Sequence, residues 1–193
     1  DALVQTMAQL RRLAVTLLTI ANDIRLLACG PRAGLGELLL PANEPGSSIM
    51  PGKVNPTQCE AMAMVCTQVI GMDAAVVAAG AGGHLQMNVY KPLIGFNLIE
   101  GIRLLQDACR CFRLNLVSGM EPDRDRIAFY VERSLMLVTA LTPEIGYEKA
   151  CAIAQHAHRD GLTLREAAMQ SGAITGERFD QLIDPAAMAS PHR

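Results

Sequence analysis

The sequence contains no tryptophan, and aromatic residues make up only 4% of its 193 residues. Apolar residues make up 50% of the chain, but Ala, Leu, Val, Ile and Met supply most of them. Strands favour β-branched and aromatic side chains, whereas Ala, Leu and Met favour helices. The composition therefore predicts an all-α fold, in a chain long enough to bury a substantial core.

The sequence also lacks an excess of charge of one sign, since its formal net charge is −2. A nearly neutral chain gives no electrostatic reason to expect a nucleic acid or a membrane surface as its partner. No run of about 18 apolar residues is present, so no membrane span is expected. Asp1 falls inside a helical pattern, and we therefore expect that the chain has been cut there and that any targeting signal lies upstream.

The six cysteines lack the spacing of a zinc site or a redox pair, because the sequence contains no C-x-x-C motif. Most of them lie among Ala, Leu and Met, where a reduced cysteine acts as a small apolar residue. We expect a reducing compartment, with a reactive or paired thiol as the alternative. His156 and His158 are two residues apart, so on a helix they face different ways and cannot share a metal ion. We therefore expect no metal site.

Glycine and proline are both absent from residues 2–29, and apolar residues recur there at alternating intervals of four and three. This heptad pattern is typical of a long helix that packs against other helices. A helix of about 28 residues is about 42 Å long, which is too long for a compact domain of this size. We therefore expect it to belong to a bundle larger than this chain. The apolar seam consists of Leu3, Met7, Leu10, Ala14, Leu17, Ala21, Ile24 and Ala28.

Residues 30–56 break the helical pattern with five glycines and five prolines, and no regular structure is expected there. A connection this long is usually functional or disordered, and its apolar residues argue against disorder. We predict two domains: 1–120, part of a long-helix bundle that carries the loop 46–56, and 121–193, a small C-terminal helical domain. Beyond the first helix, helices are expected from 56 to about 71 or 79, and over about 92–116, 123–140, 147–159, 164–171 and 176–183.

The segment 46–56 reads Gly-Ser-Ser-Ile-Met-Pro-Gly-Lys-Val-Asn-Pro. Asn55 is a good N-cap and Pro56 suits the first helical position, so a helix should begin there with its free N–H groups facing the loop. Lys53 adds a positive charge to the partial positive charge of the helix start, and Asn55 adds an amide. Together these groups predict a receptor for a carboxylate or a phosphate.

A serine in such a loop can also move a proton, because backbone donors and a helix start stabilise an alkoxide. The serine could then deprotonate a carbon beside a carboxylate, while Lys53 and Asn55 hold the resulting dianion. On the residues alone, the alternative is a glycine-rich connector with incidental polar side chains. A nucleotide-type phosphate loop is disfavoured, because Gly46 and Gly52 are six residues apart instead of five and Val54 follows the lysine.

The eleven residues 46–56 resemble the signature loop of the fumarase/aspartase superfamily, lyases that eliminate across the C–C bond of succinyl-type substrates and release fumarate. The continuation Thr57-Gln58-Cys59-Glu60 resembles that of class II fumarate hydratases, whereas aspartate ammonia-lyases carry a Val-Val-Pro-Glu type run. The resemblance spans the whole chain, which would be the C-terminal portion of a family subunit. Further matching stretches are 20–25, 30–32, 34–37, 43–45, 134–141 and 161–164.

The resemblance implies roles for single residues. Ser47 matches the catalytic base that removes the C3 proton of malate, and Ser48 matches a substrate contact. Glu60 matches an acidic residue that influences activity, although a glutamate in the first turn of a helix is also ordinary dipole complementation. The segment that matches the binding site of the substrate carboxylate is Lys53, Val54 and Asn55.

The resemblance further implies reversible hydration of fumarate to malate, a step of the tricarboxylic acid cycle, by general acid–base catalysis without metal or organic cofactor. The acid partner, a histidine acting through water, is expected upstream of this chain. The resemblance also implies a homotetramer with sites shared between subunits, in the cytoplasm or, in a eukaryote, the mitochondrion. The alternatives are another superfamily lyase such as aspartate ammonia-lyase or, for the isolated chain, an inactive helical assembly module.

Overall fold

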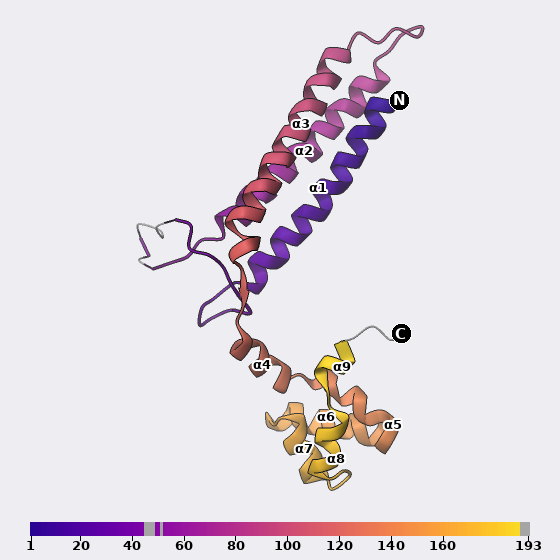
Figure 1. The fold of residues 1–193 in the computed structure, drawn as a ribbon. Coiled ribbons are helices and arrows are strands. Elements are labelled where there is room, and N and C mark those ends of the chain that lie inside the picture. The colour runs from indigo at the N-terminus through magenta and orange to yellow at the C-terminus, as the bar shows by residue number, and fades with distance from the viewer. Residues whose placement is uncertain (45–48, 51, 190–193) are drawn as a thin grey trace. The chain divides into compact units, whose positions relative to one another are not determined.

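A computed structural model describes residues 1–44, 49, 50 and 52–189 of the chain. These residues are mostly helical, with one small sheet of two short strands, so the prediction of an all-α fold is confirmed (Figure 1). The chain divides into two compact units, residues 1–123 and 124–193.

The first unit, residues 1–123, is built on three long helices. They are α1 (Ala2–Leu27), α2 (Thr57–Ala81) and α3 (Lys91–Asn115), and they lie side by side along their lengths (Figure 1). A long loop joins α1 to α2 and a short hairpin joins α2 to α3, so each helix runs antiparallel to the one before it.

The heptad seam of α1 forms part of the core, where Met7, Ala14 and Ala21 are fully buried at intervals of seven. Leu3, at the start of the same seam, is 45% exposed, so α1 is covered along only part of its apolar face. Removing apolar surface from water stabilises the unit by about 25 cal/mol per Å². The apolar side chains that α2 and α3 bury beside α1 are Cys59, Met62, Cys66, Val69, Val76, Ala79, Ile94, Leu105 and Phe112.

One carboxylate lies within this apolar core. Asp73 of α2 is 3% exposed, and Arg11 of α1 binds it with 3.0 Å between Nη1 and Oδ2. Oδ1 of Asp73 is buried and has no hydrogen-bond partner among the described residues. A buried carboxylate stays charged only when a cation or several donors compensate the lost hydration. Arg11 is the cationic partner of this buried side chain and links α1 to α2.

The connection between α1 and α2 contains more regular structure than the sequence predicts. Strand β1 (Leu38–Leu39) pairs antiparallel with β2 (Glu121–Pro122), which follows the 3-10 helix η1 (Val117–Gly119) after α3. The N–H of Glu37 also donates to the carbonyl of Leu27 at 2.8 Å. The prediction of an irregular connection is therefore wrong at this point, because the apolar residues of β1 pair with a strand beyond α3.

The hairpin between α2 and α3 is held by one side chain. Its tip places Leu85 and Gln86 at φ 46° and 70°, a left-handed backbone that non-glycine residues seldom adopt. Nδ2 of Asn88 donates to the carbonyl of Ala79 at 2.9 Å, and its Oδ1 accepts from the N–H of Tyr90 at 2.8 Å. Asn88 therefore caps the end of α2 and orders the start of α3.

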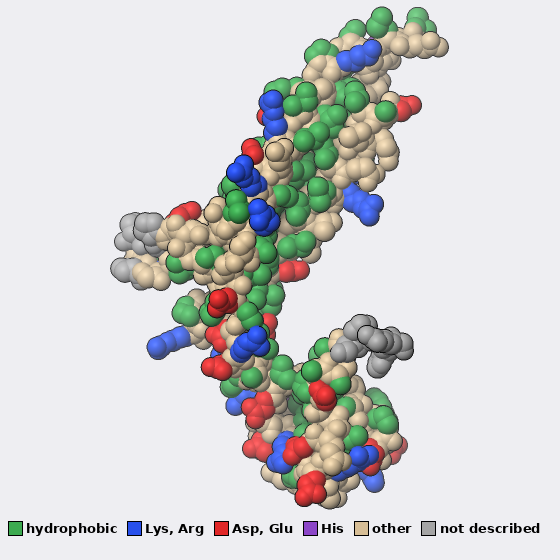
Figure 2. All heavy atoms as spheres, in the orientation of Figure 1, with side chains coloured by type: hydrophobic (Ala, Val, Ile, Leu, Met, Phe, Trp, Pro, Cys, Tyr) green, Lys and Arg blue, Asp and Glu red, His purple; other side chains and the backbone are tan. Residues whose placement is uncertain are grey.

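The surface of the first unit carries many apolar side chains, and Figure 2 shows them gathered along the helices. Among the described helices, α2 alone is long and apolar enough to cross a membrane, a test that a buried core helix also passes. The larger exposed apolar side chains of α1, α2 and α3 include Leu13, Val15, Ile20, Leu26, Met64, Val77, Phe96, Ile99 and Ile102.

The second unit, residues 124–193, packs short helices around Leu141, Ile153 and Phe179. The single helix predicted over 123–140 is wrong, because the backbone of Ser134 is extended and separates an α-helix from a 3-10 helix. The helices are α4 (Arg124–Glu132), η2 (Leu135–Leu141, 3-10), α5 (Thr142–Ile145), α6 (Tyr147–Asp160), α7 (Leu164–Ser171), α8 (Gly176–Leu182) and α9 (Pro185–Ala189).

Replacing Arg11 with Ala should destabilise the chain by about 1–3 kcal/mol, because Asp73 would remain buried without its cation. Urea unfolding followed by circular dichroism measures the loss. The control is Arg103→Ala, which removes an exposed ion pair between Arg103 and Glu100 at 2.7 Å. That change should cost less than about 0.5 kcal/mol. Equal losses in both variants would contradict the role assigned to Arg11.

Candidate functional site

The predicted site lies where the loop after α1 reaches the start of α2. Ser47 and Ser48, predicted as catalytic base and substrate contact, lie outside the described residues. The structure describes the other four predicted residues, which lie at the end of the loop and in the first turn of α2: Lys53, Val54, Asn55 and Glu60.

Helix α2 begins one residue later than predicted. Pro56 occupies the N-cap position with φ −81° and ψ 52°, which is outside the helical region, and Thr57 is the first helical residue. The assignment of Asn55 as the N-cap is therefore wrong. Pro56 has no side-chain acceptor and makes no side-chain cap, and its carbonyl accepts the helical hydrogen bond from the N–H of Glu60 at 3.1 Å. The start of α2 still meets the end of the loop, as an anion receptor requires.

A turn brings the chain to that helix start. Gly52 has φ 80°, the left-handed region that favours glycine, and the N–H of Lys53 donates to the carbonyl of Met50 at 3.2 Å. The side chains of Lys53 and Val54 are exposed, and Asn55 is half-buried. The turn therefore presents a positive charge and an amide within three residues of each other, directly before the N–H groups of α2.

Glu60 is held by a residue from the other side of the loop. Nη2 of Arg25, in the last turn of α1, lies 3.1 Å from Oε1 of Glu60, in the first turn of α2. The side chains are 51% and 41% exposed, so this ion pair contributes little to stability by itself. It does fix the orientation of one carboxylate beside the start of α2.

Two further hydrogen bonds tie the loop to the helices. The hydroxyl of Thr57 donates to Oε1 of Glu44 at 3.1 Å, and Nδ2 of Asn43 donates to the carbonyl of Asn115 at 2.6 Å. The chain is thus attached to the start of α2 and the end of α3 directly before the signature segment. These two bonds set the position of Asn43 and Glu44.

The thiol next to Glu60 is not reactive. Cys59 is 1% exposed, and burial raises the pKa of its thiol above the ordinary value, against the opposing effect of the Arg25 cation. Burial also raises the pKa of Cys66 one heptad further along α2. Neutral, buried thiols are poor nucleophiles, so neither cysteine contributes chemistry to the site.

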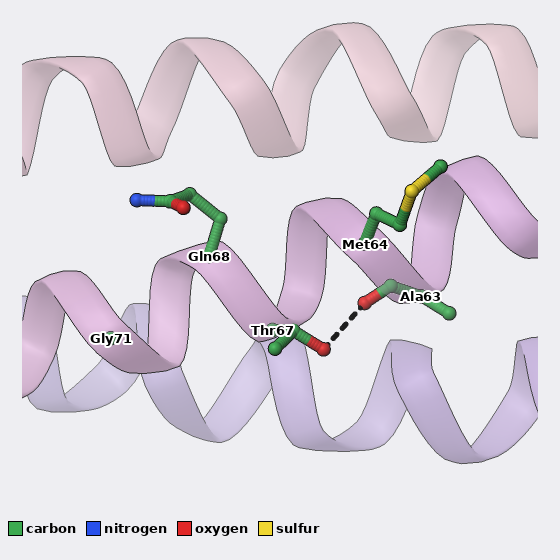
Figure 3. Close-up of a pocket in the computed structure, with 5 residues that line it drawn as sticks. All are labelled: Ala63, Met64, Thr67, Gln68 and Gly71. Atoms are coloured by element: carbon green, nitrogen blue, oxygen red, sulfur yellow. Dashed lines mark hydrogen bonds between the residues drawn. The ribbon is translucent and has the colours of Figure 1, made fainter.

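A shallow groove on the exposed side of α2 contains none of the predicted site residues. It is lined by Ala63, Met64, Thr67, Gln68 and Gly71, and the hydroxyl of Thr67 donates to the carbonyl of Ala63 at 2.8 Å (Figure 3). No titratable side chain lines it. The groove therefore suits packing rather than catalysis. Within the described ranges, no three His, Cys, Asp or Glu side chains are grouped to hold a metal ion.

Sequence reasoning did not assign Arg25, Asn43 and Glu44 to the site. A basic residue in the last turn of a helix is ordinary dipole complementation and does not identify its partner. The only signal available was that Arg25 ends the matching stretch 20–25 and that the other two residues begin the matching stretch 43–45. Their contacts cross the loop, and the sequence alone does not predict which residues a loop brings together.

Comparison with known proteins gives matches to two family models: a lyase model over residues 1–71 and a model of the fumarase C C-terminus over residues 137–190. The chain is 96% identical over 193 residues to a class II fumarate hydratase of Parasynechococcus marenigrum, covering 100% of this chain and 42% of that protein. It is 67% identical over 190 residues to one of Prochlorococcus marinus, covering 98% of this chain and 41% of that protein.

The fold is similar to the crystal structure of a class II fumarase from Schistosoma mansoni. The TM-score is 0.94 at 47% sequence identity, and the match covers 100% of this chain and 40% of that one. The chain thus spans about two fifths of the length of the curated relatives it matches.

Replacing Asn43 with Ala should loosen the loop, because the hydrogen bond to the carbonyl of Asn115 contributes about 1 kcal/mol. Amide hydrogen exchange of residues 37–44 should become about fivefold faster, since local opening then costs less. Thr67→Ala is the control, because Thr67 bonds only within α2. Unchanged exchange in the Asn43 variant would show that this bond does not hold the loop.

Proposed function

Because the chain belongs to the fumarase/aspartase superfamily of lyases, we propose that it is the C-terminal portion of a class II fumarate hydratase. The reaction is the reversible addition of water to fumarate, giving malate, as in the tricarboxylic acid cycle. The observation that carries the proposal is similarity along the whole chain to class II fumarate hydratases, with the eleven-residue signature loop included. The bacterial relatives favour a cytoplasmic enzyme.

The proposed mechanism is general acid–base catalysis. In the direction of dehydration, the Ser47 side chain acts as an alkoxide. Its oxygen takes the proton from C3 of malate and becomes a hydroxyl, and the electron pair of the broken C–H bond is delocalised into the adjacent carboxylate. Lys53, Asn55 and the N–H groups of α2 bind that carboxylate while its charge increases, and each such donor contributes about 3–4 kcal/mol to the transition state. The hydroxyl at C2 then leaves as water with a proton from an acid outside this chain. Ser48 and Val54 are proposed substrate contacts.

The proposed mechanism requires no metal and no organic cofactor. A carbanion next to a carboxylate is stabilised as the aci-carboxylate, which needs only positive charge and hydrogen-bond donors. The segment 53–60 offers a lysine, an amide and the start of a helix. Glu60 is the proposed acidic residue that supports the acid–base chemistry.

We further propose that the enzyme is a homotetramer whose sites lie between subunits. The support is α2, which is apolar on the side facing solvent as well as in the core, with Met64 67% exposed and Val77 50% exposed. A helix that is apolar on all sides is normally buried in a larger bundle. Small residues in the groove of α2 (Figure 3) allow a neighbouring helix to approach closely.

Ser47→Ala in the complete subunit should lower the turnover of malate about 10²–10⁴-fold, which is the usual contribution of one acid–base group to the rate. Absorbance of fumarate measures the rate, with malate and aspartate offered separately so that an ammonia-lyase is distinguished from a hydratase. Ser171→Ala is the control, because this hydroxyl donates to the carbonyl of Ala168 in the second unit. Unchanged dehydration of malate in the Ser47 variant would remove Ser47 from the role of base.

Gly71→Glu should dissociate the proposed tetramer, because it places a charge in the apolar groove of α2. Within one chain nothing lies within 4 Å of an added Cβ at Gly71, and glutamate has a higher helix propensity than glycine, so the helix itself tolerates the change. Size-exclusion chromatography with light scattering measures the mass. Gln9→Glu on the exposed side of α1 is the control. A tetramer of normal mass in the Gly71 variant contradicts the use of this groove in assembly.

A further inference from the structure

The ion pair between Arg25 and Glu60 differs from the other ion pairs between arginine and a carboxylate that link separate helices at the surface. Arg165 binds both oxygens of Asp180, at 2.8 and 2.9 Å. Arg178 likewise binds both oxygens of Glu144, at 3.1 and 2.8 Å. Such two-point pairs engage both carboxylate oxygens and join the two helices with a fixed geometry.

Arg25 instead binds one oxygen of its partner. Nη2 of Arg25 contacts Oε1 of Glu60 at 3.1 Å, and Oε2 accepts no hydrogen bond from any other described residue. A single contact fixes the direction of the carboxylate and leaves its second oxygen for another donor. An exposed glutamate without such a partner would sample several rotamers. Restricting it to the one rotamer that a reaction needs would then cost conformational entropy.

The position of the pair connects it to the site. Arg25 ends α1 and Glu60 begins α2, so the loop that carries the signature segment leaves and re-enters the helices on either side of this contact. Among the described residues, Arg25 of α1 pairs with Glu60, Cys59 precedes Glu60 in α2, and Glu44 of the loop accepts from the hydroxyl of Thr57. Arg25 is thus the cation that pairs with Glu60.

We infer that Arg25 is a positioning residue of the hydratase, which orients the Glu60 carboxylate through Oε1 so that Oε2 serves the acid–base machinery. This inference rests on the proposed function. Arg25 itself touches neither substrate nor proton. Its effect on catalysis passes through Glu60.

The test is a double-mutant cycle in the complete enzyme, with kcat and KM for malate measured for Arg25→Gln, Glu60→Gln and the double variant. Arg25→Gln should lower kcat about tenfold, equivalent to about 1.4 kcal/mol, and leave KM nearly unchanged. The double variant should have the kcat of Glu60→Gln alone, because Arg25 has no effect once the carboxylate is absent. Arg25→Lys should restore part of the lost kcat.

Two controls separate positioning from loss of structure. Arg103→Gln removes another exposed ion pair and should leave kcat unchanged. Thermal unfolding of every variant shows whether it is folded at the assay temperature. If Arg25→Gln unfolds early, Arg25→Lys takes its place in the double-mutant cycle with Glu60→Gln. A merely structural role would lower kcat equally with and without Glu60.

The outcomes are distinguishable. If the unmodified complete enzyme does not turn over malate, the proposed function fails and this inference fails with it. If that enzyme is active while Arg25→Gln or Glu60→Gln keeps a normal kcat, the inference alone is overturned. Additive losses in the double variant also overturn it.

Discussion

The burial of α2 between α1 and α3 is the constraint on which the first unit depends. Its buried positions recur at intervals of three and four from one end of the helix to the other, so α2 can adopt only one rotation between its neighbours. That rotation turns Cys59 into the core and leaves the next residue, Glu60, at the surface beside α1. The packing of an apolar seam thus decides which way a charged residue of the site faces.

The same seam contains Asp73, and this residue changes how the core is stabilised. With an apolar residue at position 73, α1 and α2 would be joined by apolar packing. Dispersion and the hydrophobic effect depend little on the orientation of the groups in contact. The ion pair with Arg11 has a fixed geometry and a large cost when it is broken. It links one position of α1 to one of α2, between the loop at one end of the helices and the hairpin at the other.

Local signals predicted the long helices well and predicted distant contacts poorly. The absence of glycine and proline from 2–29 and the heptad spacing are properties of neighbouring residues, and α1 follows them. The pairing of β1 with β2 joins strands of two residues each, with α2, α3 and η1 between them in sequence, so no periodic pattern reveals it. The prediction of one helix over 123–140 failed because apolar residues recur at similar spacing in a 3-10 helix and in an α-helix. Only the extended backbone at Ser134 separates the two helices.

For the site, the residues that the loop motif selects remain predictions, and the structure adds how the neighbours of the described ones are arranged. Lys53 and Asn55 do lie directly before α2, but Pro56 rather than Asn55 occupies the N-cap position, because its ψ lies outside the helical region. This leaves the Asn55 amide available to a ligand instead of committing it to the helix. The contacts of Arg25, Asn43 and Thr57 join segments far apart in the chain, so they depend on the packing of all three helices and not on any local pattern.

The two connections of α2 differ in the groups that they can present to a ligand. The hairpin to α3 is short and closed by Asn88, and it exposes Leu85, Met87 and Val89 together with one histidine, His84. The loop from α1 is long, and residues 37–44 attach it to the helices and to β2 before the signature segment begins. A segment held in this way can place several polar groups around one ligand while the helices remain unchanged, which a tight hairpin cannot do. The loop also ends at the start of α2, where unpaired N–H groups favour an anion.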